Sequence, residues 1–295
     1  MNRIQKISII SSLLGLWFTS FFSNDIQIII GFVLIFVFGI LHGANDLIII
    51  SSINQENSNK NLLKILIPYL LIITITSSLF IFIPSLAIIL FIVISGYHFG
   101  EQHWQDLNQG ISKKNKIIYS LNYGMFILLL LFNFHIPEVQ TIIQNITSHL
   151  VTVNIFKVSL YVISCILLIQ SFWLINRSSY FIKTAAVQIL YLIVFAIIFK
   201  VASLIWGFTI YFIMWHSIPS LNDQIKFLYG RYTFENFISY LKSALVYWII
   251  SLLGIFILYY LLKDENIFDA IFFSFLAAIT FPHVWVISKM FDKTS

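Results

Sequence analysis

The sequence predicts an all-α protein, a polytopic transmembrane helical bundle of about ten spans. Hydrophobic residues make up 59% of its 295 residues and charged residues only 10%, whereas about 25% of the residues of a soluble protein are charged. Apolar runs of about 20 residues, the length that crosses a hydrocarbon layer of about 30 Å, recur along the whole chain. The runs are continuously apolar, whereas the strands of a membrane β-barrel alternate in polarity.

The apolar runs define ten expected spans. They begin near Ile7, Ile26, Leu62, Pro84, Ile117, Ile155, Thr184, Val201, Phe237 and Ile267. The first run is short, and two runs meet almost head to tail at Lys200, so eight or nine spans are open alternatives. Neither a linker nor an internal repeat divides the chain, which predicts a single integral membrane domain over residues 1–295. With Cys165 as the only cysteine, no internal disulfide and no CxxC zinc site can form.

The basic residues predict how the chain is oriented, because Lys and Arg concentrate in short cytoplasmic loops. With ten spans, one side of the membrane holds only Lys157, Lys200 and Lys263, and the other side holds the remaining fourteen of the seventeen basic residues. Both termini are therefore expected on the cytoplasmic side of the cell (inner) membrane, with the spans in contact with lipid. The net charge of +5 belongs to that membrane face, so a nucleic-acid partner is not expected.

Four of the seven histidines lie at similar positions along even-numbered spans. They are His42 in FGILHGANDL, His98 in GYHFGEQHW, His216 in MWHSIPS and His283 in FPHVWV. They follow the expected span starts by 16, 14, 15 and 16 residues, or roughly 21–24 Å at about 1.5 Å per residue. Even-numbered spans run in the same direction, and ionisable groups inside a membrane tend to face the bundle interior. The pattern predicts a shared metal site in the cytoplasmic half of the bilayer.

The donor type restricts the metal. Imidazole suits zinc, copper, iron and nickel, and a set of neutral imidazoles compensates a trivalent ion less well than a divalent one. For iron this favours the ferrous state, Fe(2+), which binds dioxygen. Four protein nitrogens leave about two positions open on six-coordinate iron, whereas structural zinc is closed at four ligands. We therefore expect a catalytic metal site, with no catalytic residue beyond the metal.

Three further side chains are expected to support the ligands, because a ligating histidine usually donates its second ring N–H to a carboxylate or a carbonyl. Asp46 follows His42 by four residues and Glu101 follows His98 by three, spacings that bring each carboxylate near the helix face of its histidine. His103 follows His98 by five residues, or about 140° around a helix. It is expected beside the site or at the membrane interface.

Four short motifs, in this order along most of the chain, resemble those of the Brp/Blh family of membrane-bound beta-carotene 15,15'-dioxygenases. They are HGAND at 42–46, HFGE at 98–101, HS at 216–217 and PH at 282–283. The resemblance implies iron bound by histidines and oxygen-dependent cleavage of the central 15,15' double bond of beta-carotene. The product would be two molecules of all-trans-retinal, which suggests supply to a microbial rhodopsin.

The chain departs from the family pattern at one position. The family often has a second histidine four residues after the HS histidine, and Ser220 stands there in this sequence. Serine is a poor substitute for imidazole. His283, His103 or a water molecule could complete the ligand set, with Ser220 itself as a further candidate, or the activity could be altered.

A transporter or proton pathway that uses intramembrane His and Asp is the alternative function. It would need inverted repeats or spans interrupted by Gly or Pro. Pro68, Pro84, Pro219 and Pro282 offer some interruptions, but no convincing repeat is present. A two-iron desaturase or hydroxylase would need clustered HxxxH and HxxHH motifs, which the sequence lacks.

Overall fold

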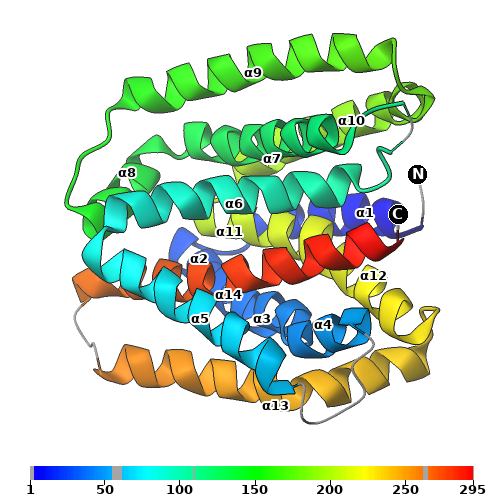
Figure 1. Cartoon of the computed structure of the whole chain (residues 1–295). Helices are drawn as coiled ribbons and strands as arrows, with labels where there is room; N and C mark the ends of the chain where they lie inside the picture. The colour runs from blue at the N-terminus through cyan, green and yellow to red at the C-terminus, as the bar shows by residue number, and fades with distance from the viewer. Residues whose placement is uncertain (1–2, 55–61, 109, 262–264, 295) are drawn as a thin grey trace. The chain divides into compact units, whose positions relative to one another are not determined.

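The structure is a computed structural model that describes residues 3–54, 62–108, 110–261 and 265–294. Within these residues the chain is helical and contains no β-strand, as Figure 1 shows. In the part of the chain that the structure describes, eight helical segments are long and apolar enough to cross a membrane, and two shorter apolar helices accompany them. The predicted polytopic helical bundle is confirmed. Lys263, which contributes to the predicted charge asymmetry, lies outside the described residues.

Each of the ten predicted spans corresponds to a helical segment. The single helices are α1 (Arg3–Thr19), α5 (Leu62–Phe82), α6 (Pro84–Trp104), α7 (Lys113–Phe134), α9 (Val153–Ile175), α10 (Ser179–Val201), α13 (Phe234–Leu261) and α14 (Glu265–Thr294). Two spans are composite: α2 (Asn24–Leu34), η1 (Ile35–Gly39), α3 (Ile40–Gly43) and α4 (Asp46–Asn54) form one, and α11 (Leu204–Tyr211), η3 (Phe212–Ser217) and α12 (Ile218–Tyr229) form the other. The short helix α8 (Ile136–Thr147) connects α7 to α9.

The predicted division at Lys200 is present. Helix α10 ends at Val201 and α11 begins at Leu204. Between them Ala202 and Ser203 have extended backbones, with ψ of 162° and 161°. This extended pair ends one helix and begins the next, so the two apolar runs are separate helices.

The chain divides into two compact units. Unit 1 comprises Met1–Ile35, Ser95–Gln140 and Val151–Pro219, and unit 2 comprises Phe36–Ile94, Thr141–Leu150 and Ser220–Ser295. Both composite spans and α6 contribute residues to both units. The single domain expected for residues 1–295 stays a prediction.

In unit 2, helix α14 packs against α4 and α5. The core of this contact consists of apolar side chains from α4 and α14. They are Leu47, Ile49, Ile50, Val286, Ile287, Met290 and Phe291. Tyr69 of α5 is partly buried against this cluster. The packing fixes the helices that carry the polar residues of unit 2.

In unit 1, α6 and α7 approach each other through glycines. A Cβ atom added to Gly100 would overlap the backbone carbonyl oxygen of Ser120, and one added to Gly124 would overlap that of Gly96. Because both obstacles are backbone atoms, they cannot rotate away. The close approach places the part of α6 that carries His98 against α7.

Replacing Gly100 with Ala should destabilise the protein, because the new methyl group must push α6 away from α7. Overpacking of this kind typically costs about 1–3 kcal/mol. Thermal unfolding of the detergent-purified variant should show a lower midpoint. Gly254→Ala is the matched control, since a Cβ there meets nothing within 4 Å. Equal midpoints for wild type and Gly100→Ala would contradict the close packing.

Candidate metal centre

Two of the predicted ligands lie at or next to a π-helical turn. The π-helix η1 (Ile35–Gly39) ends three residues before His42, and η3 (Phe212–Ser217) contains His216. Such turns are rare and occur frequently at functional sites. In unit 2 the indole N–H of Trp248 donates to the carbonyl of Val37 in η1 at 3.1 Å. The wider π-helical turns change the direction in which the following side chains project. The sequence analysis did not predict these turns.

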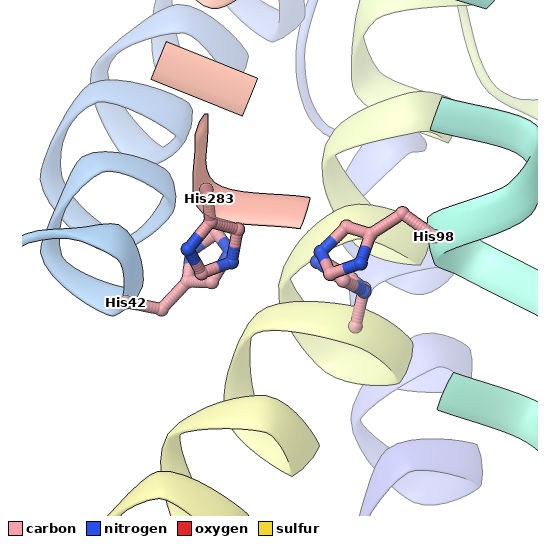
Figure 2. A group of neighbouring side chains, drawn as sticks. His42, His98 and His283 are labelled. Carbon is pink, nitrogen blue, oxygen red and sulfur yellow. The ribbon is translucent and has the colours of Figure 1, made fainter. Parts of the chain in front are cut away.

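In unit 2, His42 of α3 lies beside His283 of α14. Their ring centroids are 4.8 Å apart and the rings are nearly perpendicular, at 89°. Both residues are buried, with 4% and 3% of their surface exposed. Figure 2 shows the two rings close together, each projecting from its own helix. A Cβ atom added to Gly43 would lie 3.5 Å from Nδ1 of His283, an ordinary van der Waals contact, so Gly43 lies directly beside this ring.

Asp46 supports His283 rather than the histidine from which its position was predicted. Its Oδ1 accepts a hydrogen bond from Nδ1 of His283 at 2.8 Å. Because a carboxylate only accepts, Nδ1 carries the proton and Nε2 is the atom that His283 presents to a metal. The other oxygen, Oδ2, accepts from the hydroxyl of Tyr69 at 3.0 Å. Spacing along the chain indicates neighbours on the same helix, whereas this partner comes from another helix.

In unit 1, His98 of α6 lies beside His216 of η3. Their ring centroids are 4.5 Å apart at an angle of 75°, and both residues are buried. Two aromatic rings enclose His216: Phe99 lies 5.0 Å away edge to face, and Phe212 is stacked at 5.5 Å. In Figure 2 the ring of His98 projects from α6. The ring of His216 is therefore packed between apolar aromatic rings.

Glu101 and His103, also on α6, occupy two different environments in unit 1. Glu101 is buried and its Oε1 accepts the hydroxyl of Tyr97 at 2.5 Å. The ring of His103 lies in an aromatic cluster, with centroid distances of 5.3–6.4 Å to its neighbours. These neighbours are Tyr123, Tyr191, Phe195 and Tyr211. The supporting roles expected for Glu101 and His103 stay predictions.

Ser220 takes part in a hydrogen-bond network of unit 2. It is fully buried, and Nε2 of Gln224 lies 3.0 Å from its hydroxyl oxygen. The same Nε2 donates to the backbone carbonyl of His42 at 2.8 Å. The hydroxyl of Tyr240 lies 2.7 Å from Oε1 of Gln224 and 3.2 Å from the carbonyl of His42. Ser220 is thus bonded to a residue that also bonds the backbone of the candidate ligand His42.

The sequence analysis did not identify Tyr69, Gln224 or Tyr240. Tyr69 and Tyr240 are polar residues inside largely apolar helices, and Gln224 is one of several polar residues of the amphipathic helix α12. Each is a weak signal by itself. Gln224 and Tyr240 are 182 and 198 residues away from His42 along the chain. No local pattern connects residues so far apart, so only the fold reveals these contacts.

His42 and His283 in unit 2, and His98 and His216 in unit 1, are buried histidines that could offer ligand atoms to a metal ion. The geometry of the two pairs provides a test. With imidazole nitrogens about 2.0–2.1 Å from the ion, two rings at neighbouring octahedral positions have centroids roughly 4.5 Å apart, and tetrahedral positions give roughly 5 Å. The observed centroid separation is 4.8 Å for the pair in unit 2 and 4.5 Å for the pair in unit 1. Each value by itself fits two imidazoles bound to the same ion.

Comparison with known protein families yields a match. A family model described as "Beta-carotene 15,15'-dioxygenase" matches residues 33–291. The match covers most of the chain and includes all four histidines. None of the curated proteins and none of the solved structures matches the chain.

Proposed function

Since the chain belongs to the beta-carotene 15,15'-dioxygenase family, we propose that it cleaves the central 15,15' double bond of beta-carotene with dioxygen. Membership implies a carotenoid dioxygenase, and the apolar helices make it a membrane protein. The product of central cleavage is two molecules of all-trans-retinal. The single observation that carries the proposal is the presence of four buried histidines, in two pairs, within the matched residues.

We assign the metal ligands to both histidine pairs. Each pair has the ring separation of two neighbouring ligands, and two imidazoles alone leave most positions of a six-coordinate ion without protein ligands. The four-histidine set predicted from the sequence would supply four neutral nitrogens, which favours a divalent ion. The family's dioxygen chemistry favours Fe(2+) as that ion, because structural zinc is closed at four ligands. Bound there, Fe(2+) would supply the dioxygen chemistry of the cleavage.

The residues of the chain would hold the metal, orient its ligands and exclude water from the site. Asp46 holds His283 in the tautomer that presents Nε2. Phe99 and Phe212 cover His216 with apolar rings, which keeps water from the ligand and offers the polyene an apolar surface. Beta-carotene is dissolved in the hydrocarbon layer, so it can enter from lipid without crossing water. The scheme needs no general acid or base from the protein.

The activity can be tested in cells that accumulate beta-carotene. Expression of the wild type should bleach their orange colour and yield retinal, measured by chromatography of a lipid extract. His42→Ala should leave the cells orange because the ligand set is incomplete. Gly254→Ala, a change in open space on α13, is the control and should bleach like the wild type. Unchanged pigment with the wild type would refute the proposed cleavage.

The fourth ligand can be tested by metal content. Purified wild type, reconstituted with ferrous iron, should hold about one iron per chain. His283→Ala should lose most of this iron, because a ligand with carboxylate support is removed. Ser220→Ala should keep it, because Ser220 is bonded to Gln224 and is not needed as a ligand. Iron lost from Ser220→Ala but kept by His283→Ala would reverse the assignment.

The orientation in the cell (inner) membrane rests on the distribution of basic residues along the sequence. We place both termini in the cytoplasm. Green fluorescent protein fused to the carboxyl terminus should therefore fluoresce, and alkaline phosphatase fused there should be inactive. Alkaline phosphatase fused after Ala202, between α10 and α11, should be active. Active phosphatase at the carboxyl terminus would contradict this orientation.

A further inference from the structure

We propose that Tyr69, Gln224 and Tyr240 are positioning residues of the metal centre. They hold His283 and His42 of unit 2 in place without binding the ion. Tyr69 acts through Asp46 on His283, and Tyr240 acts through Gln224 on His42. The inference rests on the proposed function only in that the two histidines bind a metal.

The first arm is a chain of hydrogen bonds that runs from Tyr69 through Asp46 to His283. Asp46 is 1% exposed, and a carboxylate in an apolar interior must have its oxygens hydrogen-bonded. One oxygen is bonded to Nδ1 of His283 at 2.8 Å and the other to the hydroxyl of Tyr69 at 3.0 Å. Because the two bonds engage both oxygens, the carboxylate has one rotational setting. Tyr69 thereby fixes the direction in which the His283 ring points.

The second arm is a chain of hydrogen bonds that runs from Tyr240 through Gln224 to His42. His42 lies in the last turn of α3, which ends at Gly43, and the last carbonyls of a helix need donors from elsewhere. The single hydroxyl proton of Tyr240 is donated to the nearer acceptor, Oε1 of Gln224 at 2.7 Å. This bond orients the amide so that Nε2 faces the carbonyl of His42 at 2.8 Å. The backbone that carries the His42 ring is thereby fixed.

Asn45, in the turn between α3 and α4, fastens the same region to α13. Its Nδ2 donates to the backbone carbonyl of Tyr240 at 3.1 Å, and its Oδ1 accepts from the hydroxyl of Ser243 at 3.0 Å. Asn45 and Tyr240 are both fully buried. The positioning residues of the two arms therefore lie on α5, α12 and α13. The candidate ligands of unit 2 lie on other helices.

The test measures metal affinity apart from carotenoid cleavage. Full-length protein in detergent is titrated with Co(2+) against a competing chelator, and the visible Co(2+) spectrum reports the coordination geometry. Tyr69→Phe and Tyr240→Phe each remove one hydroxyl and should weaken binding by about tenfold or more and change the spectrum. Tyr247→Phe, a partly buried tyrosine packed on the apolar core of unit 2, is the control and should bind like the wild type.

A double-mutant cycle separates positioning from a general structural role. If Tyr69 acts only through Asp46, Tyr69→Phe should cause no further loss of affinity in an Asp46→Ala background. Independent, multiplicative losses would overturn this arm. Gln224→Met, which keeps the side-chain length and removes the hydrogen bonds, tests the second arm if Tyr240→Phe does not fold.

The outcomes distinguish this inference from the proposed function. Wild-type affinity and spectrum in Tyr69→Phe and Tyr240→Phe would overturn the positioning role and leave the metal centre intact. A wild-type protein that binds no Co(2+) would instead refute the metal centre, and with it the iron-dependent function. Retained Co(2+) binding without carotenoid cleavage would refute only the activity.

Discussion

Polar side chains inside an apolar helical bundle must find hydrogen-bond partners within the protein, because the hydrocarbon layer offers none. The polar interior of unit 2 follows this constraint. Asp46 has a partner for each carboxylate oxygen, and the carbonyl of His42 accepts from Gln224, whose amide is oriented by Tyr240. The hydrogen bonds that satisfy these buried polar groups also fix the positions of the His42 and His283 imidazoles. A metal centre built on them is preorganised before the ion arrives.

Departures from regular helix serve the same arrangement. The turn between α3 and α4 interrupts one composite span, and π-helical turns occur in both. Each interruption frees backbone groups that the membrane cannot satisfy. Trp248 compensates one of them at Val37, and Gln224 compensates another at His42. An irregular backbone at this depth persists only with such donors, which links the position of the ligands to residues far away in the sequence.

The fold and the candidate ligands could be predicted because their signals are local. Continuous apolar runs identify helices, and counting residues from each start identifies His42 and His283 as residues of similar depth. The partners of the ligands gave no such signal. Asp46 lies four residues after His42, yet its bond to His283 spans 237 residues. Contacts of this kind depend on which helices pack together, which periodicity does not encode.

Ser220 and His283 are alternative candidates for the fourth ligand, and their contacts differ in what a ligand requires. A ligating imidazole needs a partner for its second nitrogen, because that bond fixes the tautomer and the ring direction. Asp46 provides this partner to His283. Ser220 is bonded to Gln224, which uses the same Nε2 to support the carbonyl of His42. Without the serine hydroxyl, Gln224 would lose this hydrogen bond, whereas His283 as a ligand would have the Asp46 carboxylate as the partner of its second nitrogen.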